Sequence, residues 1–348
     1  MARKVYVGMS GGVDSSVTAA LLKEQGFDVM GVYMKNWSKD LPGFVCPWKE
    51  DYQDAKRVAV QLGIDFKLYD FETEYRHKVV DYMLNEYQAG RTPNPDIMCN
   101  QEVKFKLFLE TALEDGADMI ATGHYARVKN GRLFVGIDDN KDQSYFLYRV
   151  TKDALSKSLM PIGELKKPEV RKRARDLGLV TADKKDSQGI CFVGNIGIKE
   201  FLLAELGPQP HGPIIDQDGT TIGEHDGAMF YTTGQRQGLH VGGGLPYYVT
   251  DKNMSTNTVY VTTNLADTKL WHTEFVLKDV HWIGGQFPTS KTLFVRTRYR
   301  AALVGARIVR IDDDRISVTL SDAVRALTIG QSAVFYEGEE CIGGGVVV

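Results

Sequence analysis

Strand and helix signals alternate along the first two hundred or so of the 348 residues in this chain. Short apolar runs are each followed by a segment of about 10–15 residues with helical spacing. Strands joined by such helices run parallel, because each helix returns the chain to the edge where the next strand begins. We therefore expect an α/β domain with a parallel sheet, built from residues 4–10, 13–26, 28–34, 50–63, 65–71, 102–116 and 118–126.

The pattern changes after residue 207. Gly, Pro, Asp and Asn punctuate short segments that are rich in Val, Ile, Thr, Tyr and Phe, such as residues 257–263 and 315–321. This texture is typical of small antiparallel sheets and barrels. GPQPHGP at residues 207–213 reads as a linker. We predict three parts, residues 1–207, 208–274 and 275–348, of which the last two are small β-rich domains and the last is barrel-like.

Composition excludes several classes of protein. No apolar run approaches the ~18 residues of a membrane-spanning helix, and the start of the chain leads into a strand without a signal peptide or an Arg- and Ser-rich presequence. We expect a cytoplasmic protein without a membrane partner. Seven histidines without HxH or HExxH spacing argue against a zinc site, and we predict no metal-ligating residues. We assign Cys46 and Cys341 to structure.

The formal net charge of -3 argues against a globally basic nucleic-acid binder. Basic residues nevertheless gather in two stretches, 166–175 and 296–300, which lie in different halves of the chain. Two such stretches favour a surface that follows a phosphate backbone over two ordinary solvated faces.

A glycine-containing segment, SGGVDSS at residues 10–16, lies between the first strand and the first helix. Gly11 and Gly12 allow the main chain to approach an anion closely, and the following helix directs its first amides to the same place. The segment lacks the GxxxxGK[ST] spacing and its lysine, which disfavours a γ-phosphate kinase or motor. Asp14 beside a phosphate site suggests a Mg²⁺ partner. The segment resembles the PP-loop of the N-type ATP pyrophosphatases, which adenylate a carbonyl oxygen.

Two cysteines lie in segments that favour reactivity. Cys99 follows the stiff segment Thr92–Pro95 and is expected at the start of a helix, where backbone amides stabilise a thiolate. Asp96 is placed to act as a general acid or base. Cys191 lies in KKDSQGICF, where nearby lysines favour a thiolate or persulfide anion.

Several long motifs resemble the tRNA-specific 2-thiouridylases (the MnmA/TrmU family), in order along the whole chain. They are GRTPNPDIMCN (90–100), GHYARV (123–128), DQSYFL (142–147), DSQGICF (186–192), FYTTGQRQGL (230–239) and RYR (298–300). The resemblance implies a Rossmann-like domain of the adenine nucleotide alpha hydrolase type. It also implies an ATP-dependent enzyme that converts the wobble uridine of tRNA (Lys, Glu and Gln type) to 2-thiouridine.

The same resemblance implies roles for individual residues. Cys191 would carry a persulfide supplied by a protein sulfur donor, and its terminal sulfur would attack C2 either directly or as hydrosulfide. Cys99 would attack the inner sulfur to form a Cys99–Cys191 disulfide, with Asp96 handling the proton. ATP, with Mg²⁺, would be held by Gly8, Met9, Ser10, Gly11, Gly12, Val13, Asp14, Ser15, Met34 and Gly123. The target base would meet Asn94, Pro95 and Asp96. The tRNA would meet His124, Lys141, Asp142, Gln143, Arg298, Tyr299 and Gln331.

Three other functions compete with this interpretation. Another PP-loop ligase could act on a small-molecule carbonyl, a non-enzymatic RNA-binding protein could retain a degenerate loop, and 4-thiouridine synthesis is a related chemistry. The intact SGGVDSS segment disfavours the second, and the lack of additional RNA-binding modules disfavours the third.

Overall fold

The computed structural model describes residues 2–41, 45–186, 197–242, 244, 246–290 and 292–348. Its first part is built on a five-stranded parallel sheet with strand order β3-β2-β1-β4-β7. The strands are β1 (Lys4–Gly8), β2 (Asp28–Lys35), β3 (Asp65–Asp70), β4 (Met119–Ala121) and β7 (Ser158–Leu159). Strand order reverses at β1, and ligands of such sheets bind beyond the carboxyl ends of the strands at that point.

Two apolar cores cover the two faces of this sheet. Val5 and Val7 face one core, and Tyr6 faces the other, so β1 is an apolar run rather than an alternating strand. The first core includes α1 (Val13–Glu24), α2 (Trp48–Leu62) and α8 (Lys167–Asp176).

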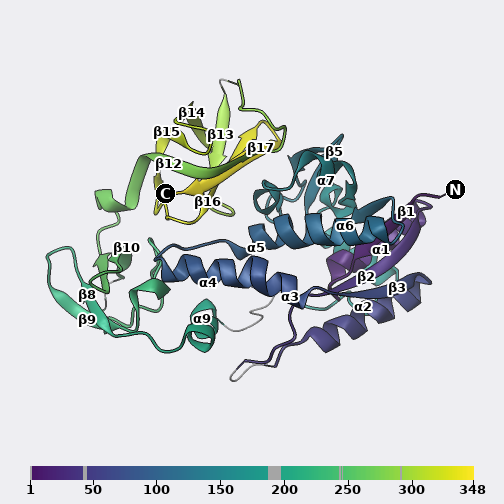
Figure 1. Ribbon diagram of the computed structural model, residues 1–348, viewed down its shortest axis with the longest axis horizontal. Helices are drawn as coiled ribbons and strands as arrows, with labels where there is room; N and C mark the ends of the chain where they lie inside the picture. Colours follow the sequence, from purple (N-terminus) through teal and green to yellow (C-terminus); the bar gives the residue numbers. More distant parts are fainter. Residues whose placement is uncertain (1, 42–44, 187–196, 243, 245, 291) are drawn as a thin grey trace.

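The other face is covered by two long helical runs that contact each other. One consists of α3 (Glu72–Tyr75), η1 (Arg76–Val80) and α4 (Asp81–Gln88), and the other of α5 (Pro95–Met98), η2 (Cys99–Leu107) and α6 (Phe108–Glu114). The segments η1 and η2 are π-helical. Figure 1 shows the two runs crossing the middle of the molecule. The remaining helices are α7 (Lys152–Ser156) and α9 (Ile198–Leu206), with short 3₁₀ turns η3 (Ser144–Leu147), η4 (Pro161–Glu164), η5 (Ala228–Phe230) and η6 (Thr268–Leu270).

The rest of the chain is β-rich, as expected. A four-stranded sheet has the order β10-β11-β8-β9. Six further strands close into a barrel, because β12 pairs with both β15 and β17. The strands are β8 (Gly212–Ile215), β9 (Thr221–His225), β10 (Tyr248–Asn253), β11 (Thr258–Thr262), β12 (Trp271–Trp282), β13 (Leu293–Arg296), β14 (Val304–Arg310), β15 (Ile316–Arg325), β16 (Ser332–Glu337) and β17 (Glu340–Val347). The predicted fold class is confirmed.

One connection was not anticipated. The hairpin β5 (Ala126–Lys129) and β6 (Arg132–Val135) belongs to the first part of the chain, yet β6 pairs with the start of β17 in the barrel. The first part of the chain is therefore joined to the barrel by strand pairing (Figure 1). The division at residues 207/208 and 274/275 remains a prediction, and β12 continues through the second of these positions.

Candidate functional site

The loop that follows β1 is shaped for a close anion. Gly11 has a φ of +73°, and a Cβ there would lie 2.8 Å from the Asp51 Cα, so only glycine fits. Gly12 is the N-cap of α1 and provides no capping side chain. The first amides of α1 therefore have no side-chain acceptor at the cap and can donate to a bound phosphate.

Hydroxyl groups hold this loop in place. The Ser10 amide donates to Ser15 Oγ at 3.1 Å, and Ser16 Oγ donates to the Gly12 carbonyl at 2.8 Å. Ser10 itself is exposed, whereas Ser15 is buried. The loop is therefore a fixed cradle with one hydroxyl facing solvent.

The other residues expected at ATP surround the cradle. A Cβ at Gly8 would lie 2.9 Å from Met34 Cε, and one at Gly123 would lie 2.8 Å from the Ser15 amide. Met9 and Val13 are buried and belong to the core beneath the loop. The structure thus brings Gly8, Met34 and Gly123 to SGGVDSS, although Met34 and Gly123 are far from it in sequence.

The carboxylate of Asp14 has partners that the sequence did not suggest. Lys167 Nζ lies 2.8 Å from both Asp14 oxygens, and the Tyr125 hydroxyl donates to Asp14 Oδ1 at 2.7 Å. Burial, followed by the charge of Asp14, raises the pKa of Tyr125, so the hydroxyl remains a donor. Lys167 also pairs with Asp186 at 2.8 Å.

Asp186 gathers further cations. Lys141 and Arg171 each lie 2.7 Å from its carboxylate. Burial opposes ionisation of Asp186, but hydrogen bonds from Lys141 and Lys167 lower its pKa to about 2. A charged network therefore joins the loop after β1 to the last described residue before the segment 187–196.

The helical run that carries Cys99 begins earlier than expected. Pro95 occupies the first turn of α5, Asn94 is its N-cap, and the Cys99 amide already donates to the carbonyls of Pro95 and Asp96. The prediction that Cys99 lies at the helix N-terminus is therefore wrong, and Asp96 lies in that first turn instead. Burial raises the pKa of the Asp96 carboxyl, opposed by the charge of Lys104. A carboxyl of raised pKa suits proton transfer near neutral pH.

This helical run extends beyond the edge of the sheet. Gly8 is the last residue of β1, and a Cβ there would lie 3.5 Å from Phe108. Phe108 is therefore the helical residue that lies beside the edge of the sheet. Cys99 precedes Phe108 by nine residues, a rise on the order of 10 Å. Cys99 is 2% exposed and opens the π-helical segment η2, a geometry that is frequent at functional sites. Cys191 lies outside the described residues.

Comparison with known proteins accounts for the order of these motifs. Three profiles match in succession: "tRNA methyl transferase HUP domain" over residues 3–195, "tRNA methyl transferase PRC-barrel domain" over 199–263 and "Aminomethyltransferase beta-barrel domain" over 272–347. The chain is 50% identical to the tRNA-specific 2-thiouridylase MnmA of Shigella dysenteriae serotype 1 (strain Sd197), over 99% of this chain and 97% of that protein. The MnmA protein of Escherichia coli (strain K12) is 49% identical over the same shares.

The chain belongs to the tRNA-specific 2-thiouridylase family.

Solved structures resemble this 2-thiouridylase family member only distantly. NMN synthetase from Francisella tularensis covers 53% of this chain and 66% of its own, with 16% identity and a TM-score of 0.35. A complex of a 4-thiouridine synthetase with RNA and bound ATP covers 53% of this chain and 43% of its own, with 19% identity and a TM-score of 0.38. Likeness at this level supports no functional argument.

His124, expected at the tRNA, is buried in this family member. It is 7% exposed, its Nδ1 lies 2.8 Å from Thr122 Oγ1, and its ring lies 5.6 Å from that of Phe105. Burial, and then the charge of Lys104, lowers its pKa well below the ordinary value. The imidazole is therefore neutral and buried, and its contact with tRNA stays a prediction.

Lys141, Asp142 and Gln143 are also engaged within the protein. Asp142 is 4% exposed, accepts from Ser144 at 3.0 Å and pairs with Arg296 at 3.0 Å. Gln143 accepts from the Tyr125 amide at 3.0 Å. The Asp142 carboxylate is therefore buried against a barrel arginine, and its contact with tRNA stays a prediction.

Residues of the barrel reach the segment before Asp96. Gln331 donates to the Thr92 carbonyl at 2.9 Å, and the Thr92 amide donates to the Ile329 carbonyl at 3.0 Å. On the other side, Thr92 Oγ1 lies 3.0 Å from Thr232 Oγ1 of the central β-rich part. The position of the Asn94–Asp96 segment is therefore set by all three parts of the chain.

Arg298 and Tyr299 differ in their surroundings. Arg298 donates to the Thr233 carbonyl at 2.8 Å, and burial lowers its pKa, so it links the barrel to the central part. Tyr299 is half-buried, and its ring lies 4.6 Å from that of Phe146, with the Arg300 guanidinium 5.1 Å from its own ring. Tyr299 therefore packs against a tilted aromatic ring and a guanidinium while remaining partly open, and its contact with tRNA stays a prediction.

The basic stretch 166–175 proves to be largely neutralised. Beyond the ion pairs of Lys167 and Arg171, the structure pairs Lys172 with Asp176, Arg173 with Glu24, and Arg175 with Asp183. The interpretation of this stretch as an open phosphate-tracking surface loses its main support. Sequence alone could not show this, because Glu24 comes from α1.

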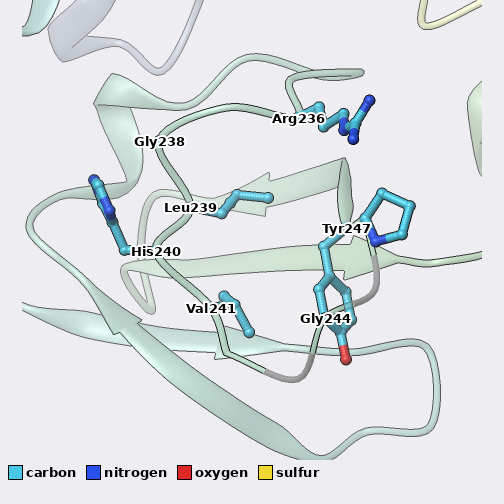
Figure 2. Close-up of a pocket in the computed structure, with 8 residues that line it drawn as sticks. Arg236, Gly238, Leu239, His240, Val241, Gly244 and Tyr247 are labelled. Carbon is cyan, nitrogen blue, oxygen red and sulfur yellow. The ribbon is translucent and has the colours of Figure 1, made fainter.

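Other features of the described residues lie outside this site. Cys46 is half-buried and Cys341 buried, and burial raises the pKa of both thiols. In the described part of the chain, no cluster of three or more His, Cys, Asp or Glu side chains is arranged for a metal, and no helix there combines the length and apolar character of a membrane span. A pocket of about 350 Å³ lies on the central β-rich part. Its lining includes Arg236, Leu239 and Tyr247 (Figure 2), none of which we assign to the site.

Proposed function

We propose that this chain catalyses the ATP-dependent conversion of the wobble uridine of tRNA to 2-thiouridine. The observation that carries the proposal is 50% identity, over 99% of the chain, to a protein named tRNA-specific 2-thiouridylase. The glycine cradle, with its uncapped α1, supports nucleotide phosphate binding. Methyl transfer, which the profile descriptions mention, has no need of such a cradle.

The proposed reaction has two stages. First, the uracil C2 oxygen attacks the α-phosphorus of ATP, which forms the O–P bond and releases pyrophosphate. The cradle and α1 hold the phosphates. Asp14 would hold Mg²⁺ through its carboxylate, and the ion would stabilise charge on the leaving group.

In the second stage, sulfur replaces the activated oxygen. A protein donor loads Cys191 as a persulfide. Its terminal sulfur attacks C2, and AMP leaves with the former C2 oxygen. The Cys99 thiolate attacks the inner sulfur of Cys191, which forms a Cys99–Cys191 disulfide and breaks the persulfide S–S bond, so that the terminal sulfur and that bond's electron pair remain with the uracil. Asp96, with its raised pKa, accepts or returns the proton. External thiols then reduce the disulfide.

The base would enter beyond the carboxyl edge of the parallel sheet. The cradle and the helical run that carries Asp96 and Cys99 would then lie on two sides of the base. A wobble base is in a single-stranded loop, so its extrusion costs less than flipping from a duplex.

The test is a reconstituted reaction. The protein would be incubated with ATP, Mg²⁺, a sulfide source and unmodified glutamate tRNA, and the digested nucleosides weighed. We expect a mass increase equal to sulfur replacing oxygen at C2 of uridine. Cys46→Ser is a matched control for Cys99→Ser, since both remove one thiol. A product heavier by one methylene would instead show methylation. AMP and pyrophosphate formed only with a small carbonyl substrate would overturn the tRNA assignment.

A further inference from the structure

The cradle after β1 contains no cation of its own. Residues Ser10–Ser16 include no lysine or arginine, whereas other phosphate loops carry a lysine that reaches the phosphates. The fold supplies one from elsewhere, because Lys167 Nζ lies 2.8 Å from both oxygens of Asp14. Lys167 is 8% exposed, so this is not a surface side chain that happens to reach the loop.

The position of Lys167 is fixed by the start of α8. Its backbone amide donates to Asp138 Oδ2 at 2.8 Å, and the preceding Lys166 amide donates to Glu169 Oε2 at 2.7 Å. The helix α8 packs against α1, the helix that begins within the cradle. The ammonium is therefore held beside the loop by two packed helices.

Two carboxylates share the ammonium of Lys167 with other cations. Among the described residues, Lys167, Lys141 and Arg171 contact the two carboxylates Asp14 and Asp186. Asp186 keeps two cations without Lys167. If Asp14 binds a metal ion, the Lys167 ammonium needs another anion, because a buried charge without a partner is costly.

We propose that Lys167 is a phosphate-binding residue of this site and contacts the two phosphates that leave ATP as pyrophosphate. When the bond from the α-phosphorus to the bridging oxygen breaks, its electron pair remains on pyrophosphate, and the adjacent ammonium stabilises that charge. This inference rests on the proposed adenylation and adds to it the cation that SGGVDSS lacks.

The test is equilibrium binding of nucleotides in the absence of tRNA. The probes are AMP and an ATP analogue with a methylene bridge between the α- and β-phosphates, which cannot react. We expect Lys167→Met to weaken binding of the analogue roughly 10- to 100-fold, the range of a charge-assisted hydrogen bond, and to leave AMP binding nearly unchanged. Lys172→Met, on the exposed side of the same helix, should bind both probes as the wild type does. An equal loss for AMP and the analogue would overturn the proposal.

A second comparison separates phosphate binding from simple neutralisation of Asp14. In Asp14→Asn that charge is already absent, so a neutralising Lys167 would have no further effect. We expect the double variant Asp14→Asn/Lys167→Met to bind the analogue at least 10-fold more weakly than Asp14→Asn. Equal affinities would refute a phosphate contact. The comparison of Asp14→Asn with Asp14→Asn/Lys167→Met can also be made if Lys167→Met alone fails to fold, because the double variant has no carboxylate at position 14 that would lose its ammonium partner.

The proposed function and the role of Lys167 are tested by different outcomes. A wild-type protein that binds neither nucleotide would overturn the proposed function together with the role of Lys167. A wild-type protein that binds the analogue and thiolates tRNA, with Lys167→Met binding equally well, would overturn only the role of Lys167. Lys167→Arg, which keeps the charge, should recover part of the lost affinity.

Discussion

Asp142→Asn tests whether Asp142 stabilises the fold or contacts tRNA. Asp142 and Arg296 have side chains that are 4% and 16% exposed, and their charged atoms are 3.0 Å apart. Arg296 Nε is already buried without a hydrogen-bond partner. Neutralising Asp142 leaves the guanidinium almost buried and unpaired, which typically costs about 3–5 kcal/mol. Because asparagine retains one acceptor for the neighbouring amides, we expect a loss near the lower end, about 3 kcal/mol.

The assay is urea unfolding followed by circular dichroism. A loss of about 3 kcal/mol lowers the midpoint by roughly 1 M for an m-value near 3 kcal/mol/M. Asp142→Asn/Arg296→Met removes both charges and should be more stable than the sum of the single changes predicts. Asp176→Asn breaks an exposed pair with Lys172 and should cost less than about 1 kcal/mol. In conditions where all variants are folded, we expect wild-type affinity of Asp142→Asn for tRNA.

An unchanged midpoint for Asp142→Asn, together with weakened tRNA binding, would refute this reasoning. That result would mean that the ion pair with Arg296 contributes nothing to stability and that the carboxylate meets the tRNA after all.

Three further predictions concern the site. Gly11→Ala should weaken nucleotide affinity at least 10-fold and lower the free energy of unfolding by about 1–3 kcal/mol, because it places a Cβ at a positive φ and against backbone atoms. Nucleotide titration measures the first effect, and the urea midpoint measures the second. Asp96 has a raised pKa, so its contribution to stability is greatest below the ordinary carboxyl pKa and is lost as pH rises through the folded-state pKa. Asp96→Asn should remove this part of the pH dependence of the free energy of unfolding. The same pH dependence in the wild type and in Asp96→Asn would contradict the prediction. Cys99→Ser and Cys191→Ser should each abolish thiolation yet still release pyrophosphate with tRNA, and normal thiolation by either would remove that cysteine from the mechanism.

Much of the fold followed from local pattern. The helix-length spacing between apolar runs required a parallel sheet, and the short segments after residue 207 required antiparallel β-structure. The cradle was also readable, because Gly11 and Gly12 precede a helix directly and the geometry depends on neighbours in sequence. The error at Cys99 is local as well. Pro95 is a favourable first helical residue, so the helix begins at Pro95, about one turn before the position that we predict.

The sequence by itself determined the class of fold, the anion-binding loop and the family. The tertiary structure decided which side chains complete the site. Lys167 meets Asp14 across 153 residues, and Gln331 meets Thr92 across 239. It also turned Lys167 and Arg171 of the basic stretch 166–175 inward onto Asp186, and it buried Asp142 against Arg296. Local conformational preferences act over a few residues, whereas the partner of a charge is chosen by packing, because a charge that is removed from water must find an opposite charge wherever the fold places one.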